Sequence, residues 1–115
     1  MGMDLVRRRD SRKWSCSNTL WLYLLDAAMK AGWKPSGTEN KSEEKGKHDA
    51  QDYHSQNGQV VTSSDAEQIY ECLQTFIRQH HPTGIEKEVL ESFIEWVARR
   101  DENNTLVDVP GFIIR

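Results

Sequence analysis

The chain has 115 residues, of which 15 are basic and 18 acidic, so its formal net charge at pH 7 is -3. This length suits one domain spanning residues 1–115 and excludes a second core. No apolar run approaches the roughly 18 residues that a membrane span needs, and three arginines follow Leu5-Val6 where a signal peptide would stay apolar. We therefore expect a cytoplasmic protein without a membrane partner. Cys16 and Cys72 are too few for a disulfide framework or a zinc set, which predicts two buried thiols.

Residues 2–16 predict a β-hairpin, because two short segments with strand preference flank a charged turn around Asp10-Ser11. Side chains alternate between the two faces of a strand, so every second residue would face the core. The residues that this alternation assigns to the inner face are Met3, Leu5, Arg7, Trp14 and Cys16.

From Ser17 the apolar period changes to steps of three and four residues, which indicates an amphipathic helix. Ser17 or Asn18 can cap its start, and Gly32 stands where a helix commonly ends in a left-handed residue. Residues 34–58 then contain no large aliphatic side chain and a single aromatic one, Tyr53. Such a stretch cannot bury enough apolar area to offset its ordering entropy, so we expect a flexible polar loop.

Residues 59–62 favour a short edge strand after the Asn57-Gly58 turn. Ser64 with Glu67 forms a capping box, with Ser63 as a competing cap, and predicts a second helix that ends near His80.

Thr83 with Glu86 repeats the capping pattern and predicts a third helix ending near Arg99-Arg100, where basic residues suit the helix dipole. The terminal segment 111–115 reads as a strand that pairs with the N-terminal strand. The whole pattern predicts an α+β fold in the order ββα, loop, βααβ, with three helices packed on one face of a small, mostly antiparallel sheet.

No catalytic residue is nominated by the sequence, since it contains neither a nucleophile motif nor a phosphate-binding glycine loop. Asp65 and Glu67 could pair for acid–base work, but their place at a helix start favours capping. We therefore expect no cofactor, and we predict a non-enzymatic protein.

A metal site is the first specific alternative, because four imidazole and carboxylate ligands crowd into seven residues. Their spacing matches no known zinc or calcium loop, and a metal would have to order the segment itself, so a solvated polar loop is favoured. These weak candidates are His48, Asp49, Asp52 and His54.

Nucleic-acid binding is the second alternative, because five basic residues gather at the predicted hairpin beside Trp14. Phosphate neutralisation with aromatic stacking is how a β-ribbon can hold a strand. Residues 1–35 carry seven basic and three acidic groups, whereas residues 36–115 carry eight and fifteen. An ordinary soluble turn is nevertheless the commoner meaning of such a cluster. Its basic residues are Arg7, Arg8, Arg9, Arg12 and Lys13.

Protein binding is the leading hypothesis, because a long polar segment of this kind often orders on a partner. The candidate contacts are Trp33, just past the first helix, and Tyr53 in the loop, although core packing is the favoured role for Trp33. The protein would then be an adaptor, an immunity protein or an accessory protein. A homodimer stays open, since residues 59–62 and the terminal strand both have β edges to satisfy.

The chain also resembles a family of short bacterial and phage-encoded proteins that begin with MGMD and have no assigned activity. The resemblance rests on MGMDL at 1–5, SNTLW at 17–21, GWKPSGT at 32–38, NGQVVTSSDA at 57–66 and GFI at 111–113. It implies a small α+β fold and a bacterial cytoplasmic setting, and it carries over no catalytic residue.

Overall fold

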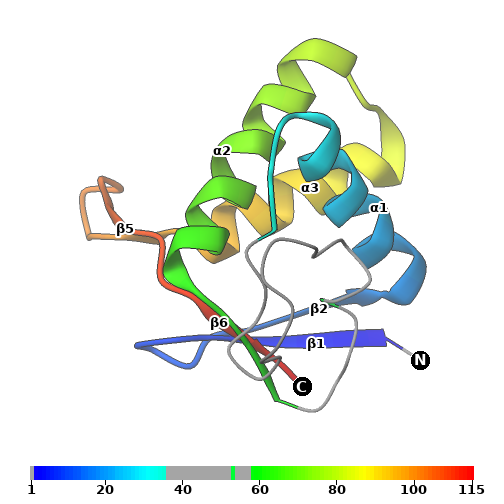
Figure 1. The fold of residues 1–115 in the computed structure, drawn as a ribbon. Helices are drawn as coiled ribbons and strands as arrows, with labels where there is room; N and C mark the ends of the chain where they lie inside the picture. The colour runs from blue at the N-terminus through cyan, green and yellow to red at the C-terminus, as the bar shows by residue number, and fades with distance from the viewer. Residues whose placement is uncertain (1, 36–52, 54–57) are drawn as a thin grey trace.

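The computed structural model describes residues 2–35, 53 and 58–115, which form three helices and two antiparallel sheets (Figure 1). The helices α1 (Asn18–Lys30), α2 (Ser63–His80) and α3 (Gly84–Val97) lie together on one face of the larger sheet. The α+β class predicted from the sequence is therefore confirmed.

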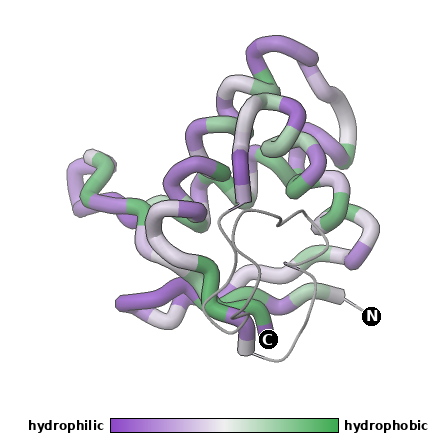
Figure 2. Tube along the Cα trace, viewed as in Figure 1, coloured by the Kyte–Doolittle hydropathy of each residue, from purple (hydrophilic) through white to green (hydrophobic). Residues whose placement is uncertain are grey.

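The larger sheet has the strand order β2-β1-β6-β3, and every pairing in it is antiparallel. β1 (Gly2–Arg7) and β2 (Lys13–Ser17) are the predicted hairpin, and β3 (Gln59–Val61) is the predicted edge strand. β6 (Phe112–Ile114) lies between β1 and β3, so the predicted pairing of the two chain ends is confirmed. Figure 2 shows the hydrophobic character of this C-terminal strand.

The core lies between the inner face of this sheet and the three helices. Met3 and Leu5 of β1 are fully buried, as the alternation predicts, while Trp14 and Cys16 of the edge strand β2 are only half-buried. Trp21 of α1 lies at the centre, with its ring 5.9 Å from that of Phe93 and 6.1 Å from that of Phe112. Burial raises the pKa of Cys16 to about 12, as expected for a thiol packed against apolar side chains.

The helix starts differ in part from the prediction. Ser17 caps α1 and accepts a hydrogen bond from the Leu20 amide at 3.2 Å, as predicted. α2 is capped by Thr62 instead of Ser64 or Ser63, because the chain is still extended at Thr62 after leaving β3 and its hydroxyl accepts from the Asp65 amide. Thr83 is the predicted N-cap residue of α3, but its side chain makes no capping hydrogen bond.

The end of α3 was predicted wrongly. The helix ends at Val97, Ala98 is extended, and the two arginines form a short strand, β4 (Arg99–Arg100). β4 pairs with β5 (Leu106–Asp108), a hairpin that the sequence analysis missed. The Arg99 guanidinium donates hydrogen bonds to the Asp108 carboxylate across this hairpin, so the arginine pairs with β5 instead of lying at the helix C-terminus.

The predicted loop at 34–58 falls mostly outside the described residues, which include only 34, 35, 53 and 58 from this range. In the part of the chain that is described, no helix combines the length and apolar character needed to cross a bilayer.

Candidate functional site

Arg7 is the most deeply placed of the hairpin arginines, with 5 % of its surface exposed. Its guanidinium donates to the Asp10 carboxylate and to two backbone carbonyls at the end of α3, those of Trp96 at 2.6 Å and Ala98 at 3.0 Å. The hydrogen bond from Arg7 lowers the pKa of Asp10 below its usual value. Arg7 thus joins the β1–β2 turn to α3, and its donors are used inside the protein.

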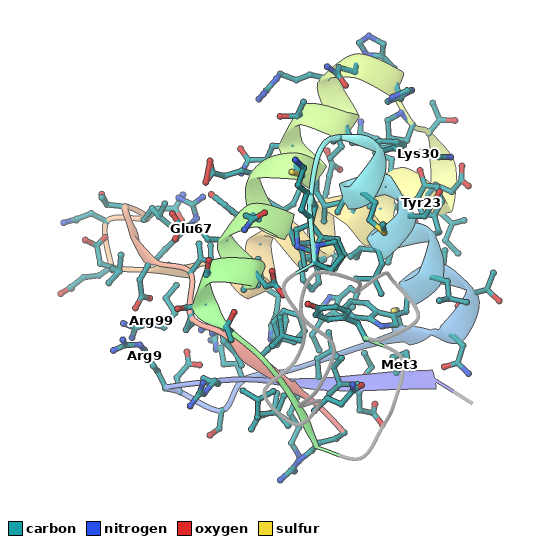
Figure 3. All side chains as sticks on the ribbon, viewed as in Figure 1. Met3, Arg9, Tyr23, Lys30, Glu67 and Arg99 are labelled. Carbon is teal, nitrogen blue, oxygen red and sulfur yellow. The ribbon has the colours of Figure 1, made fainter. Side chains whose placement is uncertain are left out.

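Asp108 holds the two hairpins together. Its carboxylate forms ion pairs with two guanidinium groups, that of Arg99 at an N–O distance of 2.7 Å and that of Arg9, from the β1–β2 turn, at 3.3 Å. The hydrogen bond from Arg99, with the charges of Arg99 and Arg9, lowers the pKa of Asp108. Figure 3 shows Arg9 and Arg99 close together beside the base of the β4–β5 hairpin.

The remaining hairpin cations, Arg8, Arg12 and Lys13, are exposed. Trp14, which the nucleic-acid hypothesis needs as a stacking surface, is half-buried and packed against α3: its indole N–H donates to Ser92 at 2.9 Å. Its ring also stacks on that of Trp96, with 6.0 Å between the centroids. The structure therefore brings the five basic residues to one hairpin but commits Arg7 and Arg9 to internal pairs.

Trp33 and Tyr53, the two candidate partner contacts, lie in the core. They are 2 % and 0 % exposed, and their rings meet edge to face at 5.1 Å. Both donate hydrogen bonds to the buried carboxylate of Asp65 in the first turn of α2. The Tyr53 carbonyl also accepts from the indole of Trp21. Both rings are buried, which agrees with the core packing favoured for Trp33 and removes the two residues as exposed partner contacts.

The four metal candidates, His48, Asp49, Asp52 and His54, lie outside the described residues. Within the described ranges, no group of three or more His, Cys, Asp or Glu side chains is arranged to hold a metal ion. His80 and His81 end α2 as the sequence suggested, with His81 in the left-handed C-cap conformation and His80 stacked on Phe76.

A groove of about 510 Å³ runs between the outer faces of α2 and α3, and we call it the α2–α3 groove. Its apolar lining comes from the half-buried Tyr70, Ile77 and Ile94. Glu91 and Glu95 of α3 stand exposed on its rim, and neither makes an ion pair within the described residues. At one end, Arg100 donates to the Tyr70 hydroxyl at 3.2 Å.

A second hollow, of about 630 Å³, lies between α2 and the β4–β5 hairpin, and we call it the β5 hollow. Leu106 and Val107 of β5 line it and are 44 % and 53 % exposed. The register shift in the pairing of β4 with β5 leaves Val107 without a cross-strand partner, so the regular alternation of side chains is interrupted here. Glu67 and Glu71 of α2 also line it, and Arg9 does so from the β1–β2 turn.

Of the predicted site residues, Arg9 lines the β5 hollow, and none lines the α2–α3 groove. The glutamates of α2 and α3 resemble an ordinary solvated helix face in the sequence. The packing of α2 on α3 places Glu91 and Glu95 at one concave surface, and the missed β4–β5 hairpin places Glu67 and Glu71 at the other. The sequence analysis missed this hairpin, and the signal that could have indicated it is the pair Leu106-Val107, two residues with strand preference after a polar turn.

Comparisons of the chain with protein-family models, with curated proteins and with solved structures found no match.

Proposed function

We propose that the protein is a non-enzymatic binding protein, of the adaptor or accessory kind, which holds a segment of a protein partner in the α2–α3 groove. The observation that carries this proposal is the combination of an apolar lining, from Tyr70, Ile77 and Ile94, with two rim carboxylates that lack ion pairs within the described residues. The resemblance in residues 1–5 and 32–38 supports a bacterial or phage setting for it.

The chemistry of the groove selects the partner segment. An apolar side chain that replaces water over Ile77 and Ile94 gains free energy from burial, about 25 cal/mol for each Å² of apolar surface. Lysine or arginine on the same segment would meet Glu91 and Glu95, which favours a basic amphipathic segment over an acidic one. Arg100, fixed on Tyr70 and on the Asn104 carbonyl, closes one end of the groove with positive charge.

Site-specific photocrosslinking tests this proposal. A photoreactive amino acid at position 94 should crosslink a protein from native lysate, because Ile94 lines the groove. The same amino acid at position 22 is the matched control, since Leu22 is 39 % exposed on α1 and lies outside the groove. The crosslinked product should diminish in the Glu91→Gln, Glu95→Gln variant. A yield at position 94 no greater than at position 22 would overturn the proposal.

A nucleic-acid-binding module is the second candidate, and the exposure of Arg8, Arg12 and Lys13 at one turn favours it. Three phosphate contacts predict that affinity for a single-stranded oligonucleotide falls roughly 20-fold between 50 and 200 mM salt. Fluorescence anisotropy with labelled DNA and RNA measures this, and the Arg12→Ala, Lys13→Ala variant should reduce the slope. Binding that is absent at 50 mM salt would eliminate this candidate.

A further inference from the structure

The β4–β5 hairpin leaves an apolar patch on the surface of the protein. β5 pairs only with the two residues of β4 among the described strands, and the hairpin projects from the body of the fold (Figure 1). Leu106 and Val107 are two of the four large hydrophobic residues that are exposed in the described chain. Figure 2 shows hydrophobic residues on this projecting hairpin among hydrophilic neighbours. Adjacent exposed aliphatic side chains on a projecting strand mark a contact surface.

Opposite charges flank this patch. On the α2 side, Glu67 and Glu71 stand one helical turn apart, and neither makes an ion pair within the described residues. On the other side, Arg9 and Arg99 share the single carboxylate of Asp108, which leaves one positive charge in excess. Figure 3 shows Glu67 on the α2 side of the hairpin and Arg9 and Arg99 below it.

This order, negative, apolar, positive, is self-complementary. A two-fold axis that lies in the interface and passes through the apolar patch places each side of the patch against the opposite side in a second copy. Leu106 and Val107 of one copy would then pack on the same residues of the other. Arg9 of each copy would face Glu67 and Glu71 of its partner, while a parallel arrangement would oppose like charges.

We infer that this surface is the interface of a symmetric homodimer, with the Leu106-Val107 patch at its centre and the Arg9 and Glu67–Glu71 contacts at its rim. The patch lies beside the α2–α3 groove, and only Tyr70 and Gln74 border both hollows. The dimer surface and the α2–α3 groove are otherwise separate. The test of the dimer can therefore fail while the test of the groove succeeds, and the reverse.

Sedimentation equilibrium of the full chain between 5 and 500 µM tests this inference. The wild-type mass should rise with concentration from that of one chain, 13.3 kDa, toward twice that value. Val107→Lys should keep the mass of one chain over the whole range, because it places a charge in the centre of the patch. Leu22→Lys is the matched control, since it adds the same charge at an exposed leucine on α1, and it should dimerise as the wild type does.

The rim contacts add a second readout. The Glu67→Lys, Glu71→Lys variant should weaken the dimer at least ten-fold, because its lysines would face Arg9 of the partner. Far-UV circular dichroism of each variant confirms that it is folded. A wild-type mass of one chain at 500 µM would overturn the inference, as would a dimer that Val107→Lys leaves intact.

Discussion

Arg7 is a buried cation whose charge is used entirely inside the protein. Its guanidinium connects Asp10 in the β1–β2 turn with the carbonyls of Trp96 and Ala98 at the end of α3. Arg9, in the same turn, is exposed and reaches only the half-buried Asp108 carboxylate. The same residue type therefore has a structural role at position 7 and is available for binding at position 12.

We expect Arg7→Ala to lower the free energy of unfolding by about 2–3 kcal/mol, because two buried carbonyls lose their donor. Urea unfolding followed by tryptophan fluorescence measures this change. Arg12→Ala is the control, since Arg12 is exposed and its substitution should change stability by less than about 0.5 kcal/mol. Equal effects of the two substitutions would contradict the structural role of Arg7.

Asp65 is the second residue whose role depends on burial. Its carboxylate is fully buried and accepts from the Trp33 indole at 3.3 Å and from the Tyr53 hydroxyl. Asp65 lies in the first turn of α2, the helix start that the sequence favoured over acid–base chemistry for this residue. The structure shows an acceptor that fixes two aromatic rings in the core.

We expect Asp65→Ala to cost about 2–4 kcal/mol of stability, because it leaves the buried Trp33 and Tyr53 donors without this acceptor. Tyr53→Phe removes a single hydrogen bond and should cost about 1 kcal/mol. The double variant should cost less than the sum of the two, since each single substitution already breaks the same bond. Strict additivity in urea unfolding would show that this hydrogen bond contributes nothing.

At the scale of elements, the junction between β3 and β6 has the closest approach to any glycine in the described chain. A Cβ atom placed on Gly111 would lie 2.2 Å from the Val61 carbonyl oxygen, far inside van der Waals contact. Glycine is needed here because the chain enters β6 directly against β3. The C-terminal strand can be central in the sheet only because this residue has no side chain.

Gly111→Ala should therefore destabilise the protein by about 3 kcal/mol or more, since backbone atoms must move apart. Gly84→Ala is the matched control: its positive φ of 64° costs about 1 kcal/mol for alanine, and no atom lies within 4 Å of the added carbon. Thermal unfolding of both variants gives the comparison. A smaller loss at position 111 than at position 84 would contradict the close approach.

At the scale of the whole molecule, two carboxylates connect the hairpins to the rest of the fold. Asp10 accepts from Arg7, and Asp108 accepts from Arg99 and pairs with Arg9. These contacts lower the pKa of both carboxyl groups below their ordinary value. Because the lowered pKa belongs to the folded state, the stabilisation is complete above the unfolded value and is lost as the pH falls through the folded values.

The free energy of unfolding should accordingly decrease as the pH is lowered below about 4. Urea midpoints at pH 6, 4 and 3 measure this decrease. Asp108→Asn should be less stable than the wild type at pH 6 and should lose less on acidification, because one of the titrating groups is gone. Asp26→Asn is the control, since its pair with Lys30 is exposed on α1, and it should keep the wild-type pH dependence.

The hairpin, the three helices and the C-terminal strand were predictable from the sequence, because their signals are local. The alternation of apolar residues identified the inner face of β1, and Ser17 was recognisable as the cap of α1. The spacing of apolar residues by three and four positions identified the helix faces that form the core. The pairing of β1 with β6 was also predictable, since an apolar terminal segment must find a buried place.

Other features depend on contacts between residues that are distant in the sequence, and only the tertiary structure shows them. Arg99 and Arg100 follow α3 as a strand that pairs with β5, where Asp108 lies opposite Arg99, and this hairpin lines one side of the β5 hollow. Core packing of Trp33 was the favoured prediction, but the burial of Tyr53 and the acceptor that both rings share, Asp65, were not predictable. Periodicity and capping act within a few residues of one another, whereas burial of a polar group depends on a partner that only the folded chain supplies.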